Sequence, residues 1–299
     1  MKTSTASLTA AWKWDGTRLR DYLALTKPEV TSLVVVSALA GFYLGARGSL
    51  DLVLLLHTLL GTALVSGGTA AFNQFFERED DAKMRRTAQR PLPAGRLEPG
   101  AALWFAAALS LAGVLYLAFF VNFLASFLAF LTWGSYLFLY TPLKKKTVLC
   151  TAVGAFPGAM PPLIGWAAAR NELSAEAWVL YAILFFWQFP HFLSIAWMYR
   201  EDYARGRILM LPVVDPAGRA TGRQMLLYSL ALLPVGVAPA LLGMAGTLYF
   251  WGALLLGVTF LGFAARAALR PSNLHAKHLL HASVIYLPLL FALLMFDKQ

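Results

Sequence analysis

Three oxygen-bearing side chains, Asn73, Glu77 and Asp81, recur at intervals of four residues near the end of an apolar stretch. If that stretch continues as a helix past Phe76, the three side chains lie on one face, with successive Cβ atoms about 5–6 Å apart. Stacked acids repel each other and oppose the dipole at a helix C-terminus, so a counter-ion stabilises them. A carboxamide and two carboxylates suit Mg²⁺, which often bridges to substrate phosphate oxygens. The spacing therefore predicts a catalytic Mg²⁺ site for a phosphorylated substrate.

Basic residues crowd the same segment and could hold the remaining phosphate charge by charge-assisted hydrogen bonds. They are Arg78, Lys83, Arg85, Arg86 and Arg90. The alternative is a solvated loop beside the membrane, whose bases follow the positive-inside rule and whose acids balance them. Asp80 projects from another helical face, so we expect Asp80→Asn to reduce turnover less than changes at the three motif positions.

A second loop carries a related pattern, because the tripeptide Arg-Glu-Asp occurs at residues 78–80 and again at 200–202. Aligning the tripeptides sets two tyrosines against Glu77 and Asp81, which suggests a weak internal repeat. Two such loops on one membrane face could hold a diphosphate and its metals between them. From this loop we expect Glu201 and Asp202 to bind metal, Asp202 to be catalytic, and Tyr199, Arg200 and Tyr203 to bind substrate. Lys144, in a run of three lysines, is either a further substrate ligand or a topology signal.

The composition shows which elements must position these loops. Of the 299 residues, 59% are hydrophobic and 13% are charged, and the mean hydropathy is +0.62. A soluble domain carries about twice that charge fraction, and the 14% of aromatic residues argues against a disordered chain. The single cysteine, Cys150, excludes an internal disulfide and a multi-cysteine metal site. The chain is therefore expected to be a polytopic membrane protein.

Nine apolar stretches are long enough to cross about 30 Å of hydrocarbon. They cover residues 29–46, 52–76, 101–120, 123–140, 148–169, 177–198, 225–245, 247–265 and 279–296. If the N-terminus is cytoplasmic, every Lys and Arg lies inside except Arg47, Arg170 and Lys298, as the positive-inside rule requires. Both charged loops are then cytoplasmic, the C-terminus is outside, and the net charge of +10 needs no nucleic-acid partner.

The expected organisation has two parts, both in an all-α integral membrane protein. Residues 1–28 form a cytoplasmic tail with a short interfacial helix near residues 18–25, and residues 29–299 form one domain of nine transmembrane helices. Pro157, Pro161 and Pro162 should break the fifth span. Free backbone groups at membrane depth are tolerated where protein buries them or where they line a cavity, so we expect this span to line the substrate chamber.

These residues resemble the UbiA superfamily of intramembrane prenyltransferases, and within it the heme O synthase branch. The first motif of the superfamily, Asn-x3-Asp-x3-Asp, is matched by Asn73, Glu77 and Asp81, with Glu for the first Asp. Further matching stretches are residues 25–28, 90–96, 140–144, 154–166, 190–192 and 202–214. The second motif usually carries Asp where this chain has Tyr199 and Tyr203, which resembles the heme-specific branch. Because tyrosine is a poor Mg²⁺ ligand, this departure argues against two symmetric three-carboxylate metal sites.

The resemblance implies the UbiA-type helix bundle, the substrates and the reaction. Farnesyl diphosphate would ionise with the help of Mg²⁺ and basic side chains, and a vinyl group of protoheme IX would attack the farnesyl cation. Water would capture the resulting cation and give heme O. The resemblance also implies a multi-pass location in the bacterial inner membrane, with a heme A synthase or a terminal oxidase as protein partner.

Among the five histidines, His191 is the strongest candidate for contact with heme, because an intramembrane histidine is a functional candidate by default. The alternative is a histidine in ordinary core packing. Two other functions stay open: a UbiA-type transferase acting on an aromatic acid or a quinone precursor, and an anion transporter. The acids lie at helix ends rather than near the middle of the membrane, which argues against the transporter.

Overall fold

The structure is a computed structural model that describes residues 16–299, and the regular secondary structure of this part is helical apart from one isolated bridge between Ala245 and Lys298. Eight of the described helical segments are long and apolar enough to cross a membrane. They are α2 (Pro28–Gly45), α3 (Leu52–Asp81), α4 (Pro99–Phe120), the continuous run α5–η1–α6 (Phe123–Leu143), α9 (Ala175–Met198), α12 (Arg219–Leu241), α13 (Thr247–Leu269) and α14 (Asn273–Phe296). The chain is thus an all-α, multi-pass membrane protein.

The predicted fifth span is divided into two short helices, α7 (Cys150–Gly158) and α8 (Pro161–Arg170). Pro161 and Pro162 occupy the first turn of α8, where a missing N–H costs no intrahelical hydrogen bond. Eight long segments and this broken pair come close to the nine predicted spans. Pro157, Pro161 and Pro162 are all buried, so these prolines lie in helix packing rather than on the surface of a chamber.

Helix α8 approaches α2 closely because a glycine on each helix faces the backbone of the other helix. A Cβ atom at Gly41 would lie 2.1 Å from the Pro162 carbonyl oxygen, and one at Gly165 would lie 1.9 Å from the Ala38 carbonyl oxygen. Small residues allow this approach in membranes, where helix association depends on packing. The Trp166 side chain beside this contact is almost completely buried.

We expect Gly165→Ala to lower the free energy of unfolding by roughly 1–3 kcal/mol, because the new methyl group meets backbone atoms that cannot rotate away. The measurement is the thermal unfolding midpoint in detergent. Gly262→Ala in α13 is the matched control, since no described atom lies within 4 Å of its Cβ position. Alanine also favours a helix over glycine, so the control should unfold at the wild-type temperature or above. Equal midpoints for the two variants would contradict the close approach of α2 and α8.

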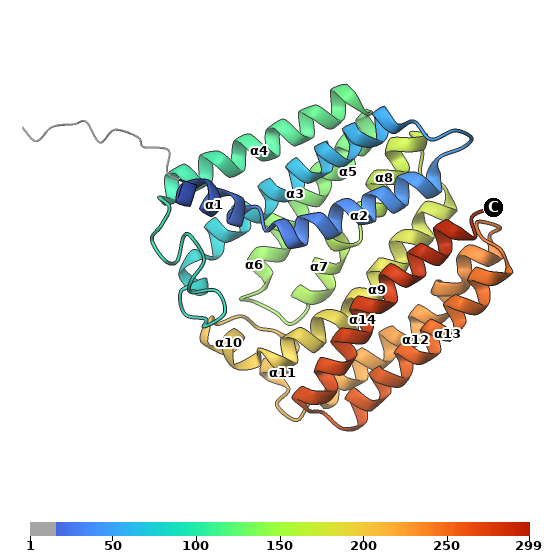
Figure 1. Cartoon of the computed structure of the whole chain (residues 1–299). Helices are drawn as coiled ribbons and strands as arrows, with labels where there is room; N and C mark the ends of the chain where they lie inside the picture. Colours follow the sequence, from blue (N-terminus) through green and yellow to red (C-terminus); the bar gives the residue numbers. More distant parts are fainter. Residues whose placement is uncertain (1–15) are drawn as a thin grey trace, which may run out of the picture.

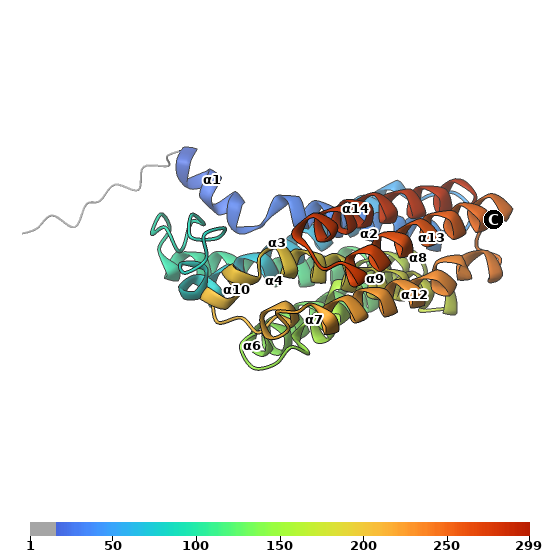
Figure 2. The same ribbon diagram turned by 90° about the horizontal axis from the view of Figure 1, so that it is seen from below.

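The polar segments gather at one end of the helix bundle. Figures 1 and 2 both place α1 (Gly16–Leu25), the loop of residues 82–98 and α10 (Arg200–Arg205) at the end opposite the C-terminus. Helix α1 lies where the interfacial helix is expected, while residues 1–15 of the predicted tail lie outside the described residues. All the residues with predicted roles in phosphate chemistry belong to this end.

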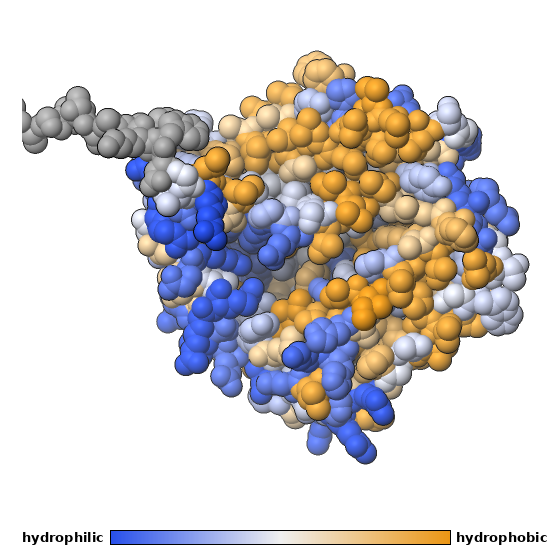
Figure 3. Space-filling model, in the orientation of Figure 1, coloured by the Kyte–Doolittle hydropathy of each residue, from blue (hydrophilic) through white to orange (hydrophobic). Residues whose placement is uncertain are grey.

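The C-terminal residues join α2 and α14 at the other end. Lys298 Nζ donates hydrogen bonds to the carbonyl oxygens of Tyr43 (2.7 Å) and Ala46 (2.8 Å), which end α2. From there α2 and α14 diverge toward the polar end in Figure 1, and the molecular surface is hollowed between them in Figure 3. The same view shows an apolar band across the middle of the bundle, with polar residues at both ends.

Candidate functional site

Helix α3 continues past Phe76 to Asp81, so Asn73, Glu77 and Asp81 do share one face, and all three are buried. Each meets a base from a different segment. Asn73 Oδ1 accepts from Lys27 Nζ at 2.8 Å, Glu77 Oε1 pairs with Lys144 Nζ at 2.6 Å, and Asp81 Oδ2 pairs with Arg90 Nη1 at 2.7 Å. We call these six residues the three-pair cluster. The repulsion between Glu77 and Asp81 is therefore relieved by Lys144 and Arg90, while Lys27 contacts the neutral amide of Asn73.

Lys27 is a site residue that the sequence analysis missed. It lies between α1 and α2 with a φ of 46°, in the left-handed region that few residues other than glycine adopt. The pKa of Lys27 is lowered to about 7, mainly by burial and also by neighbouring Arg90 and Lys144, while Glu77 and Asp81 oppose this shift. Two sequence signals were present, the matching stretch of residues 25–28 and a lysine directly before the proline that opens a span. Neither links Lys27 to Asn73, 46 residues away.

Glu77 and Lys144 line a cavity of about 290 Å³ that is open at one side. Burial disfavours the charged lysine, but the Glu77 carboxylate outweighs burial and holds the pKa of Lys144 well above its ordinary value. The other lining residues are Phe76, Asp80, Leu137, Phe138, Thr141, Pro142, Lys145 and Ile208. Ligand pockets usually measure about 300–1,000 Å³, so this volume suits the polar head of a substrate better than a whole prenyl chain.

Asp80 belongs to the same cavity, although it lies on another helical face as expected. It is 4% exposed and forms ion pairs with Lys83, at 3.2 Å, and with Lys145. Lys144 and Lys145 of the lysine run line the same cavity. Asp80 thus lines the cavity from its own helical face, the smaller effect expected for Asp80→Asn stays a prediction, and Lys83 reaches the site through Asp80.

Asp202 in α10 holds the first loop in place. One carboxylate oxygen, Oδ1, accepts a hydrogen bond from the backbone N–H of Arg85 at 3.2 Å and also pairs with Arg205. Burial favours the neutral acid, but these hydrogen bonds keep the pKa of Asp202 below its ordinary value. The guanidinium of Arg86 lies 5.4 Å from the ring centroid of Tyr199, which is 40% exposed. Asp202 and Tyr199 thus contact the loop predicted to bind phosphate.

The remaining residues of the second motif lie elsewhere. Glu201 is exposed, and Arg200 donates to the Trp197 carbonyl oxygen and to Asn273 Oδ1, toward α14. Tyr203 packs against a buried group that includes Met84. Arg78, at the end of α3, donates to the carbonyl oxygen of Phe75 and pairs with Glu79. These contacts separate Arg78, Arg200 and Glu201 from the three-pair cluster.

The lysine run, residues 144–146, also contacts the second loop. The backbone N–H of Leu209 donates to the Lys144 carbonyl oxygen at 2.7 Å, which joins residues 206–210 to the lysine run. A Cβ atom at Gly206 would lie 3.0 Å from Met84 Sδ, so the second loop also packs directly on the first. The backbone of Lys144 is therefore held independently of its ion pair.

We expect Asp202→Ala to loosen the first loop, because the Arg85 N–H loses a part-buried hydrogen bond to a charged acceptor, which contributes about 1.5–3 kcal/mol. The measurement is the rate of trypsin cleavage after Arg85 and Arg86 in detergent, which should rise. Asp215→Ala is the matched control, since Asp215 Oδ2 accepts from Thr221 at the start of α12. If both variants are cleaved at the wild-type rate, Asp202 does not hold the loop.

The donor set on α3 fits one divalent cation. Its atoms are all oxygen donors, and in the pairs of the three-pair cluster Glu77 and Asp81 each use a single carboxylate oxygen. Asn73 Nδ2 is buried and has no hydrogen-bond partner within the described chain, which leaves a donor for a ligand. Among residues 16–299, no three His, Cys, Asp or Glu side chains gather into a metal site. Asp202 also uses a single carboxylate oxygen, Oδ1, and Glu201 is exposed, so a metal bound by this second pair stays a prediction.

His191 lies in α9, a helix that contributes no residue to the three-pair cluster. Its Nδ1 is 2.8 Å from Ser283 Oγ of α14, and Trp187 stacks on its ring. His57 instead contacts Tyr116, with Nδ1 2.7 Å from the hydroxyl oxygen. The structure thus places His191 at the contact between α9 and α14.

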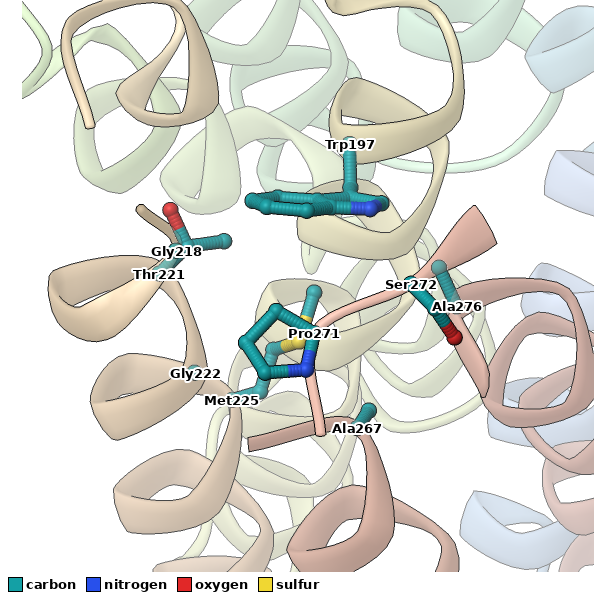
Figure 4. A pocket seen from close by; sticks show the side chains of 9 residues that line it. All are labelled: Trp197, Gly218, Thr221, Gly222, Met225, Ala267, Pro271, Ser272 and Ala276. Carbon is teal, nitrogen blue, oxygen red and sulfur yellow. The ribbon is translucent and has the colours of Figure 1, made fainter. Parts of the chain in front are cut away.

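A second hollow lies between the ends of α9, α12 and α14 (Figure 4). Its volume is about 10 Å³, which is room for roughly one water molecule. Trp197, whose Nε1 has no hydrogen-bond partner among the described residues, lies on one side of it, and Ser272 and Ala276 lie on another. This hollow is too small for an organic substrate.

The comparisons with known proteins agree on one family. The sequence profile of the UbiA prenyltransferase family matches residues 34–292. The protoheme IX farnesyltransferase of Solibacter usitatus is 54% identical over 289 residues, which cover 94% of this chain and 99% of that protein. The protoheme IX farnesyltransferase of Salinibacter ruber is 49% identical over 279 residues, or 93% of this chain and 99% of that protein.

Solved structures share the fold at low identity. A digeranylgeranylglyceryl phosphate synthase aligns with a TM-score of 0.79 at 17% identity, over 94% of this chain and 98% of that one. A UbiA homologue from Archaeoglobus fulgidus, bound to DMAPP and Mg²⁺, aligns with a TM-score of 0.68 at 17% identity, over 92% and 99%. Since the family profile covers most of the chain and the sequence relatives cover nearly all of it, the protein belongs to the UbiA prenyltransferase family.

Proposed function

We propose that the protein transfers the farnesyl group of farnesyl diphosphate to a vinyl group of protoheme IX. The carbon–oxygen bond of the diphosphate breaks and the leaving group keeps the electron pair. A carbon–carbon bond then forms to the vinyl group, and water adds to the resulting cation and loses a proton. The products are heme O, diphosphate and a proton. The acceptor is supported by the names of the sequence relatives.

The observation that carries the proposal is the three-pair cluster beside an open cavity. A diphosphate that enters the cavity can accept hydrogen bonds from Lys27, Lys144 and Arg90 in place of Asn73, Glu77 and Asp81. Charge-assisted hydrogen bonds to phosphate are about twice as strong as neutral ones. Donors held in advance around the leaving group stabilise the charge that develops on it as the bond breaks.

Mg²⁺ fits the oxygens that this exchange frees on Asn73, Glu77 and Asp81, and when bound it would neutralise the leaving diphosphate. A Mg²⁺-bound relative with the same fold supports the ion. The residues of the chain orient the substrate: Lys144 from the lysine run, Lys27 from the start of α2 and Arg90 from the first loop. Asp202, by holding the Arg85 backbone, fixes the loop that carries Arg86 and Arg90.

The proposal includes the place of the reaction. The distribution of Lys and Arg supports loops on the cytoplasmic side of a bacterial inner membrane, where diphosphate is released into water. The product passes to an acceptor of heme O, for which a heme A synthase or a terminal oxidase is proposed. The lipid bilayer holds the farnesyl chain and the porphyrin near the site.

The test is prenyl transfer by the purified protein in lipid with farnesyl diphosphate and Mg²⁺. Parallel reactions contain protoheme IX or 4-hydroxybenzoate, and mass spectrometry of the extracts identifies the prenylated product. We expect heme O and an unchanged aromatic acid. Prenylation of the acid with unchanged heme would overturn the proposal in favour of a transferase for aromatic acceptors. If Glu77→Gln forms neither heme O nor a prenylated acid, the reaction depends on the cavity that Glu77 lines.

A further inference from the structure

We propose that Ser283 is a positioning residue that holds His191 in one tautomer, with Nε2 directed to the iron of the bound heme. This inference rests on the proposed function, because it takes heme as the acceptor. It adds two residues, Ser283 and Trp187, that the sequence pattern did not single out.

The tautomer follows from counting protons. Ser283 is completely buried, and its Oγ donates to the Leu280 carbonyl oxygen at 2.6 Å. A hydroxyl group has one proton, so the same Oγ must accept in its 2.8 Å contact with His191 Nδ1. The proton of neutral His191 is therefore on Nδ1.

The other ring nitrogen is then free to act as a ligand. With the proton on Nδ1, Nε2 carries a lone pair, and it makes no hydrogen bond to any of residues 16–299. Neutral imidazole is a good ligand for iron. Histidines that bind metals almost always donate the other N–H to an oxygen, which sets the ring orientation and raises the basicity of the ligand. Ser283 is in the position of that oxygen.

Trp187 restricts the ring from a second direction. It precedes His191 by one helical turn, and the two ring centroids lie 4.6 Å apart at an interplanar angle of 23°. Its own Nε1 donates to the Ser283 carbonyl oxygen at 2.9 Å. Trp187 and His191 are thus both tied to the same residue of α14, and the imidazole cannot turn without breaking these contacts.

His191 lies eight residues, or about 12 Å along the helix axis, before Tyr199, the residue that caps the end of α9. Tyr199 contacts Arg86 at the polar end, so His191 lies deeper in the bundle than the proposed diphosphate site. A porphyrin bound there is within the apolar part of the protein. His275, whose Nδ1 donates to the Arg270 carbonyl oxygen at 2.7 Å, has the same tautomer but lies in the first turn of α14. His275 therefore serves as an internal reference.

The first experiment concerns the protein without heme. Nitrogen NMR of ¹⁵N-histidine-labelled protein in detergent, with His191→Gln for assignment, should show a protonated Nδ1 and an unprotonated Nε2 at His191, as at His275. A protonated Nε2 at His191 would overturn the inference whatever reaction the protein catalyses.

The second experiment is a titration with protoheme IX, followed by optical spectra and by the iron–histidine stretching band in resonance Raman spectra. We expect His191→Gln to lose the band and His275→Gln to keep it. Ser283→Ala should keep the fold, weaken heme binding about 10-fold or more and shift the band, because the partner of Nδ1 is lost. Ser283→Thr should restore the wild-type band.

Ser194→Ala is the matched control, since Ser194 is also completely buried and donates to the carbonyl oxygen of Pro190, beside His191. Equal heme affinity and an equal band in Ser194→Ala and Ser283→Ala would overturn the inference. If wild-type protein forms heme O while His191→Gln keeps the band, the inference fails alone. If wild-type protein shows the band but forms no heme O, the proposed function fails and the ligation stands.

Discussion

Glu77→Gln should lower kcat for prenyl transfer by about 10²–10³-fold, the usual loss when one preorganised charge contact to the transition state is removed. The change keeps the size of the side chain but removes the charge from the cavity wall. It weakens the proposed Mg²⁺ ligand set and leaves Lys144 without its acid partner. The measurement is the initial rate at saturating substrates, with the thermal unfolding midpoint recorded for each variant.

Two further variants distinguish chemistry from packing. Glu79→Gln is the same change two residues away, at a side chain that is 80% exposed and pairs with Arg78, and it should keep wild-type activity. Glu77→Gln combined with Lys144→Gln removes both charges, so it repairs a defect caused by an unpaired buried lysine. We expect the double variant to regain stability but not activity. Recovery of kcat in the double variant would show that the ion pair has a structural role only.

Lys27→Met should lower kcat/KM for the prenyl diphosphate by about 10–100-fold, because a charge-assisted hydrogen bond to a substrate phosphate contributes about 1.5–3 kcal/mol. Methionine retains the length of the side chain and its apolar contacts. The effect should be confined to the diphosphate: the KM for heme should stay within about 2-fold of wild type. Steady-state kinetics with each substrate varied in turn measure this difference.

The control for Lys27 is Lys146→Met, the same substitution at an exposed lysine of the lysine run. Both changes remove one positive charge from the polar end, so a general electrostatic effect would alter both equally. A Lys146→Met variant as impaired as Lys27→Met would therefore refute the specific role of the contact between Lys27 and Asn73.

Local periodicity explains what could be predicted from the sequence. The shared face of Asn73, Glu77 and Asp81 depends only on α3 continuing past Phe76, and helical geometry then determines the rest. The broken fifth span follows from proline chemistry in the same way. The apolar lengths were sufficient to locate the spans because hydrocarbon requires a minimum helix length.

Contacts between distant segments could not be predicted in this way. Lys27 reaches Asn73 only after α2 and α3 pack together, and its left-handed backbone has no signature in the residue type. Asp80 lines the cavity together with its ion-pair partner Lys145, which is 65 residues away in the sequence. Asp202 was recognised as an important acid, but its partner is a backbone N–H that any residue at position 85 would offer. In each case the contact depends on the tertiary packing of distant segments, which local sequence patterns do not show.

The three-pair cluster has a consequence for selectivity. Each of its bases already has a partner. A ligand therefore gains only the difference in interaction free energy between its own oxygens and the protein oxygens that it displaces. A ligand with few anionic oxygens can replace one or two partners and leaves the others unchanged, while a diphosphate with its cation can replace all three. These three resting contacts, two of them ion pairs, thus set a threshold on ligand charge, so that monophosphates and carboxylates, although common in cells, occupy the cavity weakly.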